Sequence, residues 1–412
     1  MAENACFLFD DAVARDFLPF TLTRPVGELR LGACLQRRRA ERALGVRCLG
    51  HIAADHLAGF DEPDAPPVVA TAPLDAPPPG APADQPVLYL SSRAAPAWGA
   101  ALPARAPAVL TIGGEPCGWL APPGAAPPAG FLEDPAAHAP ADVAVHELGG
   151  VLLRRVWDLV TLGEELLARD IVALAPASPR PDVPGVYVLG AGPLALGPDV
   201  RLDPQVVLDT RSGPIWLDQG VAVHAFTYLK GPAYVGPRSI LLGDEIEGSS
   251  IGPVCRVHGQ VECSILLGYD NKAHAGFLGH AYLGRWVNLG AMTTNSDLKN
   301  TYGSVDVWTP AGPVDARQTK LGCFLGDHVK TGIGLLLNTG TVVGAGCNLW
   351  GAVLPPKHVP PFSWGCGDQL VAYDLEKFLA NAAKAMGRRD MALSESAVRQ
   401  LRAAWRLGRA EA

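Results

Sequence analysis

A hydrophobic residue recurs at every sixth position from about Leu196 to about Leu349. A period of six fits neither the 3.6-residue repeat of an α-helix nor the two-residue alternation of a strand. It is the period of a parallel β-helix built from hexapeptides, in which each segment forms one short flat side of a coil. The longest unbroken run is Leu325, Thr331, Leu337, Val343 and Leu349.

Shorter stretches keep the same period, and we expect their periodic residues to point into the coil. These are Leu229 and Val235, then Ile251, Val257 and Cys263, then Leu283 and Leu289. The next residue is often glycine, as at Gly236, Gly252, Gly284, Gly290, Gly326 and Gly344. Because glycine adopts conformations closed to other residues, we expect it to permit the corner that follows.

The period is broken from Asn295 to Gln318, a stretch with Gly, Pro, Asp and Asn. It predicts an excursion loop, of the kind that often covers a binding site in solenoids. After the coil, apolar residues from Val371 to Ala382, and then Val398, Leu401 and Trp405, have helical spacing. We expect these helices to cap the end of the solenoid, where strand edges would otherwise be exposed.

The first 190 residues have the pattern of an α/β domain. Short buried strands are expected at 5–9, before Asp10 and Asp11, and at 87–90. Leu31, Leu35 and Leu44 predict one helix face, with Gly45 placed to stop the helix. Residues 152–160 predict a second amphipathic helix, and the Pro- and Ala-rich stretches 61–85 and 103–142 predict surface loops with short embedded strands.

Composition restricts the classes of function. The net charge of −7 argues against nucleic-acid binding, because no basic field is available to neutralise phosphates. No apolar stretch is long enough to span a membrane, and the first residues carry acids where a secretory signal carries bases, so we expect a cytoplasmic protein. The nine cysteines lack metal-ligand or disulfide spacing and predict reduced, mostly buried thiols, with no metal ligands assigned.

One part of the coil carries a more specific pattern, KAHAGFLG at 272–279 followed by LGRWVNLGA at 283–291. It resembles the acetyltransferase half of the bifunctional N-acetylglucosamine-1-phosphate uridyltransferase/glucosamine-1-phosphate acetyltransferases, the GlmU-like family. There a KAxHxxYLG-like stretch precedes a VNIGAGT-like stretch and an Asn-containing loop. The whole chain looks like a divergent bacterial branch of sugar nucleotidyltransferases, on the basis of Asp10-Asp11, residues 22–32, Trp157-Asp158 and residues 361–365.

The resemblance implies three parts. These are a nucleotidyltransferase-like, Rossmann-like α/β domain over 1–190, a left-handed parallel β-helix acyltransferase-like domain over 191–367, and a C-terminal helical segment over 368–412. It also implies a homotrimer with acyl sites in grooves between neighbouring coils. A closed trimer would cover apolar edges of the coil.

Carried onto this sequence, the resemblance makes His274 the catalytic base for acyl transfer from acetyl-CoA to a sugar amine. The amine must be neutral to attack, and imidazole is suited to accept its proton near pH 7. Asn288 and Asn295 match asparagines near the sugar and the acyl donor. The alternatives are that His274 is a surface histidine and that Asn288 belongs to an asparagine ladder, while His224, His258, His280 and His328 are expected to be packing or surface residues.

Further residues are assigned to the substrate. Lys272 lies in the matching KA dipeptide, Lys299 is placed to meet a sugar phosphate, and the N–H near Ala291 is the expected oxyanion donor. Phe277 replaces the tyrosine of the family. A hydroxyl that could bond the substrate is therefore missing.

The N-terminal domain lacks the usual Gly-rich phosphate loop. Residues 23–28 stand in its place with one glycine, and Arg24 and Arg30 are the cations available to a nucleoside triphosphate. Where a magnesium-binding aspartate is expected after the middle strand, the chain reads Ser91-Ser92-Arg93. Asp10, Asp11 and Asp158 are candidate acids, and each could instead cap a helix or end a strand.

Two hypotheses from different classes remain. The first is a sugar-phosphate transferase with an acyl-CoA donor, a nucleoside triphosphate and Mg²⁺, with nucleotidyl transfer alone as a variant. The second is a non-catalytic trimeric scaffold that binds sugar nucleotides.

Overall fold

The computed structural model describes residues 4–410, and the chain forms two compact units. Within the described range, the first unit comprises residues 4–29, 34–156 and 394–404, and the second comprises residues 30–33, 157–393 and 405–410. No helix in the described range is long and apolar enough to cross a membrane. The helices are α1 (Ala12–Arg15), α2 (Gln36–Leu44), α3 (Pro135–His138), α4 (Asp158–Thr161), α5 (Gly163–Leu174), α6 (Leu375–Gly387) and α7 (Glu395–Ala410), with 3-10 turns η1 (Val26–Glu28) and η2 (Asp55–Leu57).

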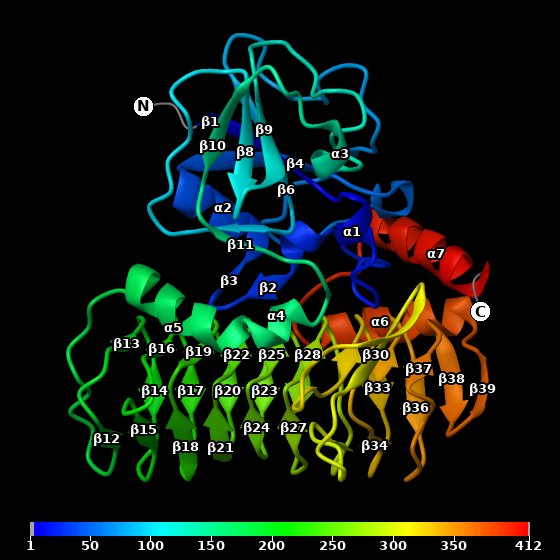
Figure 1. The fold of residues 1–412 in the computed structure, drawn as a ribbon. Coiled ribbons are helices and arrows are strands. Elements are labelled where there is room, and N and C mark those ends of the chain that lie inside the picture. Colours follow the sequence, from blue (N-terminus) through cyan, green and yellow to red (C-terminus); the bar gives the residue numbers. More distant parts are fainter. Residues whose placement is uncertain (1–3, 411–412) are drawn as a thin grey trace. The chain divides into compact units, whose positions relative to one another are not determined.

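The first unit is built on a mixed seven-stranded sheet (Figure 1). All its pairings are parallel except those of β9, which runs antiparallel to both of its neighbours. Along β1, Cys6 and Leu8 face one apolar cluster with α2, while Phe7 and Phe9 face another. In order across the sheet, the strands are β10 (Ala144–Glu147), β8 (Ala108–Ile112), β9 (Glu115–Ala121), β6 (Val87–Ser91), β1 (Asn4–Phe9), β4 (Val46–Ile52) and β5 (Val68–Ala70).

The expected strands at 5–9 and 87–90 are confirmed as β1 and β6. The helix end at Gly45 is also confirmed, because this residue adopts φ +62° and closes α2. Leu31 and Leu35, however, lie outside the helix, in β2 (Arg30–Leu31) and β3 (Cys34–Leu35). Gly32, which adopts φ +61°, lies between these two strands and separates them.

The helix predicted over 152–160 is wrong in its first half. Leu152 lies in β11 (Gly150–Leu152), which pairs antiparallel with β7 (Ala94–Pro96). Leu153 N–H continues the pairing by donating to the carbonyl of Arg93 at 3.0 Å. This segment therefore pairs with a strand instead of forming a helix. The helix α4 begins at Asp158, and α5 follows at Gly163.

The second unit is a parallel β-solenoid, seen as stacked rungs in Figure 1. One side continues through nine strands, β13 (Leu194–Leu196), β16 (Ile215–Leu217), β19 (Ala233–Val235), β22 (Ser250–Ile251), β25 (Ile265–Leu266), β28 (Tyr282–Leu283), β32 (Phe324–Leu325), β35 (Val342–Val343) and β37 (His358–Val359). A second side comprises β12 (Tyr187–Leu189), β15 (Val207–Asp209), β18 (Thr227–Lys230), β21 (Asp244–Glu247), β24 (Val261–Glu262) and β27 (Leu278–Gly279), with a further pair β29 (Thr294–Asn295) and β34 (Leu336–Leu337).

The third side is interrupted once. It comprises β14 (Arg201–Leu202), β17 (Ala222–Val223), β20 (Ile240–Leu241), β23 (Arg256–Val257) and β26 (Asn271–Lys272), then β33 (Lys330–Thr331), β36 (Asn348–Trp350), β38 (Ser363–Cys366) and β39 (Gln369–Ala372). Single bridges from Asn271 to Asn288 and from Asn288 to Lys330 join the two parts.

The six-residue period correctly identified the core of the coil. Of the periodic residues named above, all from Leu229 to Leu349 are buried except Cys263. Cys263 is half-buried and adopts φ +44°, and the neighbouring inward residue is Val261. The expected inward position of Cys263 is therefore wrong, because the preceding corner shortens this side of the rung.

The role expected for the periodic glycines is also wrong. None of the six adopts a positive φ, and they are needed because the next rung lies too close for a side chain. A Cβ on Gly252 would lie 2.2 Å from the carbonyl oxygen of Leu267, and one on Gly344 would lie 2.4 Å from Pro361. Bulky residues occupy left-handed corners instead, in a column that includes Val254, Tyr269, Trp286 and His328.

The predicted interruption after Asn295 is confirmed and contains an antiparallel hairpin, β30 (Asp306–Thr309) and β31 (Gly312–Asp315). The predicted helices are also present, although Val371 lies in β39 rather than in α6. β39 folds back antiparallel on β38 at the end of the coil. Residues Ser394–Ala404, most of them in α7, group with the first unit, where Gln400 donates to the carbonyl of Thr23 at 3.3 Å.

Candidate functional site

His274 lies on an exposed loop of the solenoid between β26 and β27. The neighbouring Lys272 is 2% exposed, and its ammonium donates to the carbonyl oxygens of His258 at 2.6 Å and of His274 at 2.7 Å. Gly259 leaves room for this ammonium, since a Cβ there would lie 2.7 Å from Nζ. Lys272 thus supports the backbone of His274 from inside the coil and does not face solvent.

The same loop is held on its far side by the next rung. Met292 N–H donates to the carbonyl of Ala275 at 2.8 Å. Gly276 adopts φ +132°, and a Cβ there would lie 2.2 Å from the carbonyl oxygen of Thr293. The backbone that carries the imidazole of His274 is therefore fixed at both ends.

His274 opens onto a cavity of about 510 Å³. The cavity lies beside the aromatic corner column, where Tyr269 and Trp286 stack with ring centroids 4.3 Å apart. Its other wall is the end of α6. The residues that line it are Tyr269, Asn271, His274, Trp286, Val287, Asn288, Lys330, Asn381, Ala385, Arg388 and Arg389.

Asn271 and Asn288 form a two-membered ladder on successive rungs. The Asn271 amide donates to Asn288 Oδ1 at 3.0 Å. The asparagine ladder considered from sequence is therefore present, but both residues are only half-buried and line the cavity of His274. Asn271 and Asn288 can therefore stabilise the coil and contact a ligand in the cavity at the same time.

The cavity is cationic. None of the described residues that line it is acidic, whereas Lys330, Arg388 and Arg389 are basic. Burial lowers the pKa of Lys330 to about 8. Arg389 also acts on Arg256 outside the cavity, where burial and then the charge of Arg389 lower the pKa of Arg256. Such a cationic cavity favours a phosphate or another anionic ligand.

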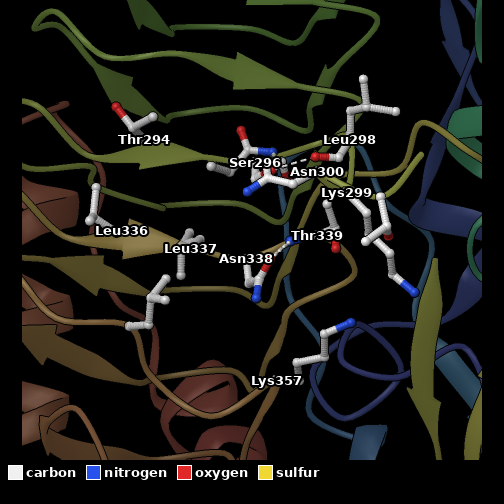
Figure 2. Close-up of a pocket in the computed structure, with 13 residues that line it drawn as sticks. Thr294, Ser296, Leu298, Lys299, Asn300, Leu336, Leu337, Asn338, Thr339 and Lys357 are labelled. Atoms are coloured by element: carbon white, nitrogen blue, oxygen red, sulfur yellow. Dashed lines mark hydrogen bonds between the residues drawn. The ribbon is translucent and has the colours of Figure 1, made fainter. Parts of the chain in front are cut away.

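A second cavity, of about 590 Å³, lies under the excursion loop (Figure 2). Lys299 in this cavity contacts the carbonyl of Ser304 and Asp306 Oδ2, while Lys357 points in from the other side. Burial, and then the charge of Lys299, lower the pKa of Lys357. Asn295 also lines this cavity, but its amide group is paired with both the N–H and the carbonyl of Gly279 at 2.9 Å.

The structure therefore divides the residues predicted in the solenoid between two sites. His274 and Asn288 share one cavity, Asn295 and Lys299 share the other, and Lys272 is internal. The carbonyl of Ala291 accepts from Gly334 N–H at 2.8 Å. Ala291 is not among the residues that line either cavity, so its role as oxyanion donor stays a prediction.

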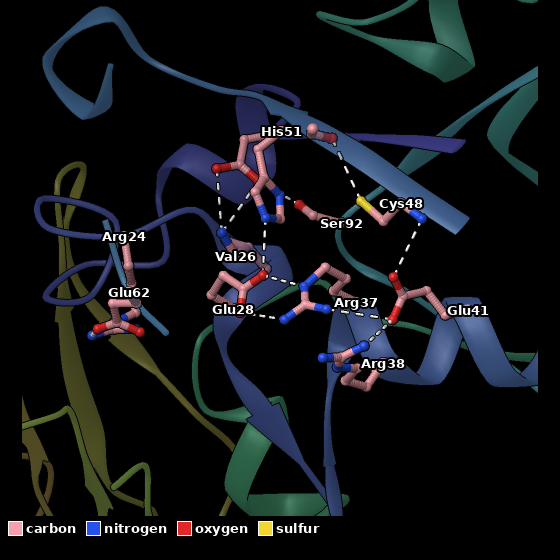
Figure 3. Close-up of polar contacts among 12 residues, drawn as sticks. Arg24, Val26, Glu28, Arg37, Arg38, Glu41, Cys48, His51, Glu62 and Ser92 are labelled. Carbon is pink, nitrogen blue, oxygen red and sulfur yellow. Dashed lines mark hydrogen bonds and ion pairs between the residues drawn. The ribbon is translucent and has the colours of Figure 1, made fainter. Parts of the chain in front are cut away.

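In the first unit, Arg24 is the cation expected to hold a triphosphate, and it forms an ion pair with Glu62. Arg24 is 1% exposed and forms two bonds to Glu62, at 2.7 and 3.1 Å (Figure 3). Beside it, Glu28 binds Arg37 at 2.5 Å and His51 at 2.9 Å. Although burial opposes ionisation, these two partners lower the pKa of Glu28 to about 2.

Arg30, the other expected cation, belongs to the second unit. Its guanidinium donates to the carbonyl of Ala33 at 2.6 Å and lies 5.1 Å from the centre of the Tyr234 ring. Its backbone N–H donates to the hydroxyl of Tyr282 at 2.8 Å. These contacts anchor Arg30 to the solenoid.

The candidate acids of the first unit are also paired. Asp11 caps α1 through the N–H of Ala14 at 2.8 Å and binds the guanidinium of Arg93 at 2.7 Å. Asp10 accepts from the hydroxyl of Ser92 at 2.5 Å, and burial raises its pKa to about 6. Asp158 begins α4 in the second unit. Asp10 and Asp11 in this arrangement do not fit a magnesium site, because one is held by an arginine and the other is buried and easily protonated.

Together, these features define a mixed α/β unit combined with a parallel β-solenoid that carries a cationic cavity beside an exposed histidine. Residues 6–177 match the family model described as sugar nucleotidyl transferase. This part of the chain is therefore similar to sugar nucleotidyl transferases, and the similarity of the chain to GlmU-type bifunctional proteins is confirmed over about 30% of its length.

Three relatives illustrate this similarity. The chain is 29% identical over 126 residues to the bifunctional sugar-1-phosphate nucleotidylyltransferase/acetyltransferase of Sulfurisphaera tokodaii, covering 30% of this chain and 29% of that protein. It is 28% identical over 130 residues to the bifunctional protein GlmU of Methanocaldococcus jannaschii (31% and 30%) and 30% identical over 136 residues to GlmU of Nitrosospira multiformis (28% and 29%). The matched regions span less than a third of each relative.

Proposed function

We propose that the solenoid transfers an acyl group from acyl-CoA, most simply acetyl-CoA, to the amine of an amino-sugar phosphate. The observation that carries this proposal is the exposed imidazole of His274 at a cavity lined by Lys330, Arg388 and Arg389 without an acidic residue. Both expected substrates carry phosphates, so cations beside a base match their chemistry. The Sulfurisphaera tokodaii relative is a bifunctional sugar-1-phosphate nucleotidylyltransferase/acetyltransferase, which agrees with this assignment.

In the proposed step, the amine nitrogen attacks the thioester carbonyl carbon while His274 removes a proton from the amine. The new C–N bond forms, the negative charge collects on the carbonyl oxygen, and the N–H of Ala291 is the group available to stabilise it. The intermediate then collapses with cleavage of the C–S bond. The thiolate of CoA takes up a proton as it leaves.

The sugar-phosphate class of substrate is also supported by the second cavity. Lys299 and Lys357 both lie there, and burial and then the charge of Lys299 lower the pKa of Lys357, against the opposing effect of Asp306. A phosphate would offset the effect of Lys299 on Lys357. Phe277, which replaces the tyrosine of the family, removes one possible hydroxyl contact to the sugar, so the substrate is best sought in a panel of amino-sugar phosphates.

We further propose a homotrimer about the solenoid. Met292, Ile333, Leu336 and Leu354 are exposed apolar residues on the coil, with Ile333 77% exposed. Leu336 and Leu354 also line the cavity that contains Lys299. A neighbouring coil packed on this surface would bury it and would add its own residues to the cavity. Light scattering on the Ile333→Glu variant tests this, with a trimer expected for the wild type and dissociation for the variant.

The test of acyl transfer is release of free CoA thiol from acetyl-CoA with glucosamine-1-phosphate and related sugars. His274→Ala is expected to lower kcat by about 10²–10⁴, the contribution typical of a general base. His224→Ala is the matched control, because His224 is an exposed solenoid histidine outside both cavities. Absence of turnover in the wild type, with sugar nucleotides still bound, would favour the scaffold hypothesis instead.

Nucleotidyl transfer is the second candidate function, favoured by the family match over residues 6–177. It needs a nucleoside triphosphate and Mg²⁺, for which the buried Arg24 and the paired Asp11 offer little. The decisive measurement is pyrophosphate release with each nucleoside triphosphate and a panel of sugar-1-phosphates. Pyrophosphate release that persists in His274→Ala would assign this activity to the first unit.

A further inference from the structure

We propose that the second unit carries a divalent-metal site suited to zinc, formed by Cys263, His280 and Glu262 and completed by Glu164. One ligand atom from each of the first three residues lies within 4.8 Å of the other two. A thiol, an imidazole and a carboxylate together form a donor set that zinc accepts and that magnesium or calcium does not favour.

Cys263 and His280 occupy the same corner on successive rungs. They adopt φ +44° and +47°, and the N–H of His280 donates to the carbonyl of Glu262 at 2.9 Å. The preceding position in this column is Gly248, where a Cβ would lie 2.8 Å from the sulfur of Cys263. The absence of a side chain at Gly248 thus leaves room for the thiol of Cys263.

The imidazole of His280 is oriented as in many metal sites. Its Nδ1 is bonded to Asp297 Oδ2 at 2.8 Å, which leaves Nε2 as the nitrogen available to a metal ion. A carboxylate behind a ligating histidine fixes the ring and raises its basicity. Gly279 provides the room, because a Cβ there would lie 2.7 Å from Asp297 Oδ2.

Glu164 supplies the fourth ligand from the first turn of α5. Its Oε2 lies 3.6 Å from the sulfur of Cys263. With bonds of about 2.3 Å to sulfur and about 2.0 Å to oxygen, a tetrahedral zinc ion places these atoms about 3.5 Å apart. The separations among Cys263, His280 and Glu262 are at most 4.8 Å and must shorten by up to about 1.5 Å. The exposed Glu164 and the half-buried Glu262 can rotate to bring their carboxylates toward the other ligands.

The charges also favour a cation at this position. Three carboxylates, those of Glu164, Glu262 and Asp297, lie around Cys263 and His280, and Lys320 lies 2.9 Å from Glu262. A cysteine binds zinc as its thiolate, so the thiol of Cys263 must give up its proton when the metal ion binds. Zinc binding would release this proton to solvent and free Glu262 from Lys320.

Such an ion would join two successive rungs to α5. The four ligands do not line the cavity of His274, so the site is structural and independent of acyl transfer. A cross-link between elements that are distant in sequence stabilises the folded state over the unfolded one by its binding free energy. The metal site therefore does not depend on the proposed function.

The experiment is titration of the full-length protein with Zn²⁺ after removal of metals by a chelator. We expect one Zn²⁺ per chain, release of about one proton, and a higher unfolding temperature with zinc. Cys263→Ser and His280→Gln should each weaken binding at least about 10-fold, and Glu164→Gln tests the site from an exposed position where folding is not at risk. The control is Cys366→Ser, because Cys366 is the other cysteine that is not fully buried.

Cobalt gives an independent readout. Co²⁺ bound to a thiolate produces a sulfur-to-metal charge-transfer band, which should appear in the wild type and in Cys366→Ser but not in Cys263→Ser. Failure of the metal-free wild type to bind stoichiometric Zn²⁺ would overturn the proposal. Binding by Cys263→Ser and Glu164→Gln that is as tight as in the wild type would do so as well.

Discussion

The ammonium of Lys272 lies 2.7 Å from the backbone carbonyl oxygen of His274 and donates a hydrogen bond to it from inside the coil. A residue expected to contact the substrate thus positions the catalytic candidate instead. The second bond of this ammonium, to the carbonyl of His258, ties the same loop to the preceding rung. The exposed loop therefore depends on a buried cation.

Replacement of Lys272 by methionine should lower both stability and acyl transfer. Two carbonyls would lose their donor, at a cost of about 1–3 kcal/mol in the free energy of unfolding. Displacement of His274 should reduce kcat more than it changes KM. Lys377→Met, at an exposed position of α6, is the control in denaturant unfolding and in the CoA-release assay. A variant with wild-type kcat would contradict the positioning role.

Binding of anionic ligands should weaken as the pH rises through about 8. Burial lowers the pKa of Lys330 to about 8, so its positive charge is present below this pH and lost above it. In Lys330→Arg the cation persists, and the affinity for CoA should stay nearly constant between about pH 7 and 9. Lys272 has its pKa lowered to about 8 as well, and the arginine variant separates the two lysines. Calorimetry should measure the affinity for CoA against pH in both proteins. If the wild type and Lys330→Arg show the same pH dependence, Lys330 does not belong to the site.

The first unit should lose stability as the pH rises from about 4 to about 6. Burial raises the pKa of Asp10 to about 6, so the folded state holds this proton more tightly than the unfolded chain does. The contribution is complete below the ordinary value of 3.8 and is lost as the pH passes the folded value, with a maximum of about 3 kcal/mol.

Asp10→Asn removes this titration. The difference in free energy of unfolding between the wild type and the variant should therefore change across this interval. Asp16→Asn, at an exposed position, should follow the wild type in the same denaturation series. If the free energy of unfolding varies with pH in the same way in Asp10→Asn and in the wild type, the pH dependence does not come from Asp10.

A methyl group at Gly252 should destabilise the coil. Its Cβ would lie 2.2 Å from the carbonyl oxygen of Leu267, so adjacent rungs would have to separate, and we expect a loss of about 1–3 kcal/mol. Gly387→Ala is the matched substitution in open space at the end of α6, and it should be neutral or stabilise by about 0.5–1 kcal/mol. Thermal unfolding of the two variants checks the difference.

The solenoid could be predicted from sequence because one periodic signal specifies which residues face inward. The conformation of individual corners could not be predicted in this way. A glycine can be required either because its φ is positive or because the next rung lies too close for a side chain. Gly252 is required for the second reason, and Trp286 shows that a bulky residue can take a left-handed corner. Cys263 was expected to point into the coil and does not. It is one of the ligands of the proposed metal site.

The candidate site was only partly accessible to sequence reasoning. His274 and Asn288 share a cavity as the resemblance suggested, whereas Lys330 was not identified. Lys330 follows Asn288 on the next rung, but the excursion loop separates them in sequence. Alignment of the rungs by their inward residues would have placed Lys330 in the same outward column. The bond between Arg24 and Glu62 had no local signal, because it joins segments that meet only through folding.

Because each rung contacts only its two neighbours, complete turns on the N-terminal side of Arg256 lie outside the cavity of His274. Evolution could add or delete such turns without moving the imidazole relative to Lys330. Homologous coils of unequal length should then be compared turn by turn, counted outward from the histidine loop.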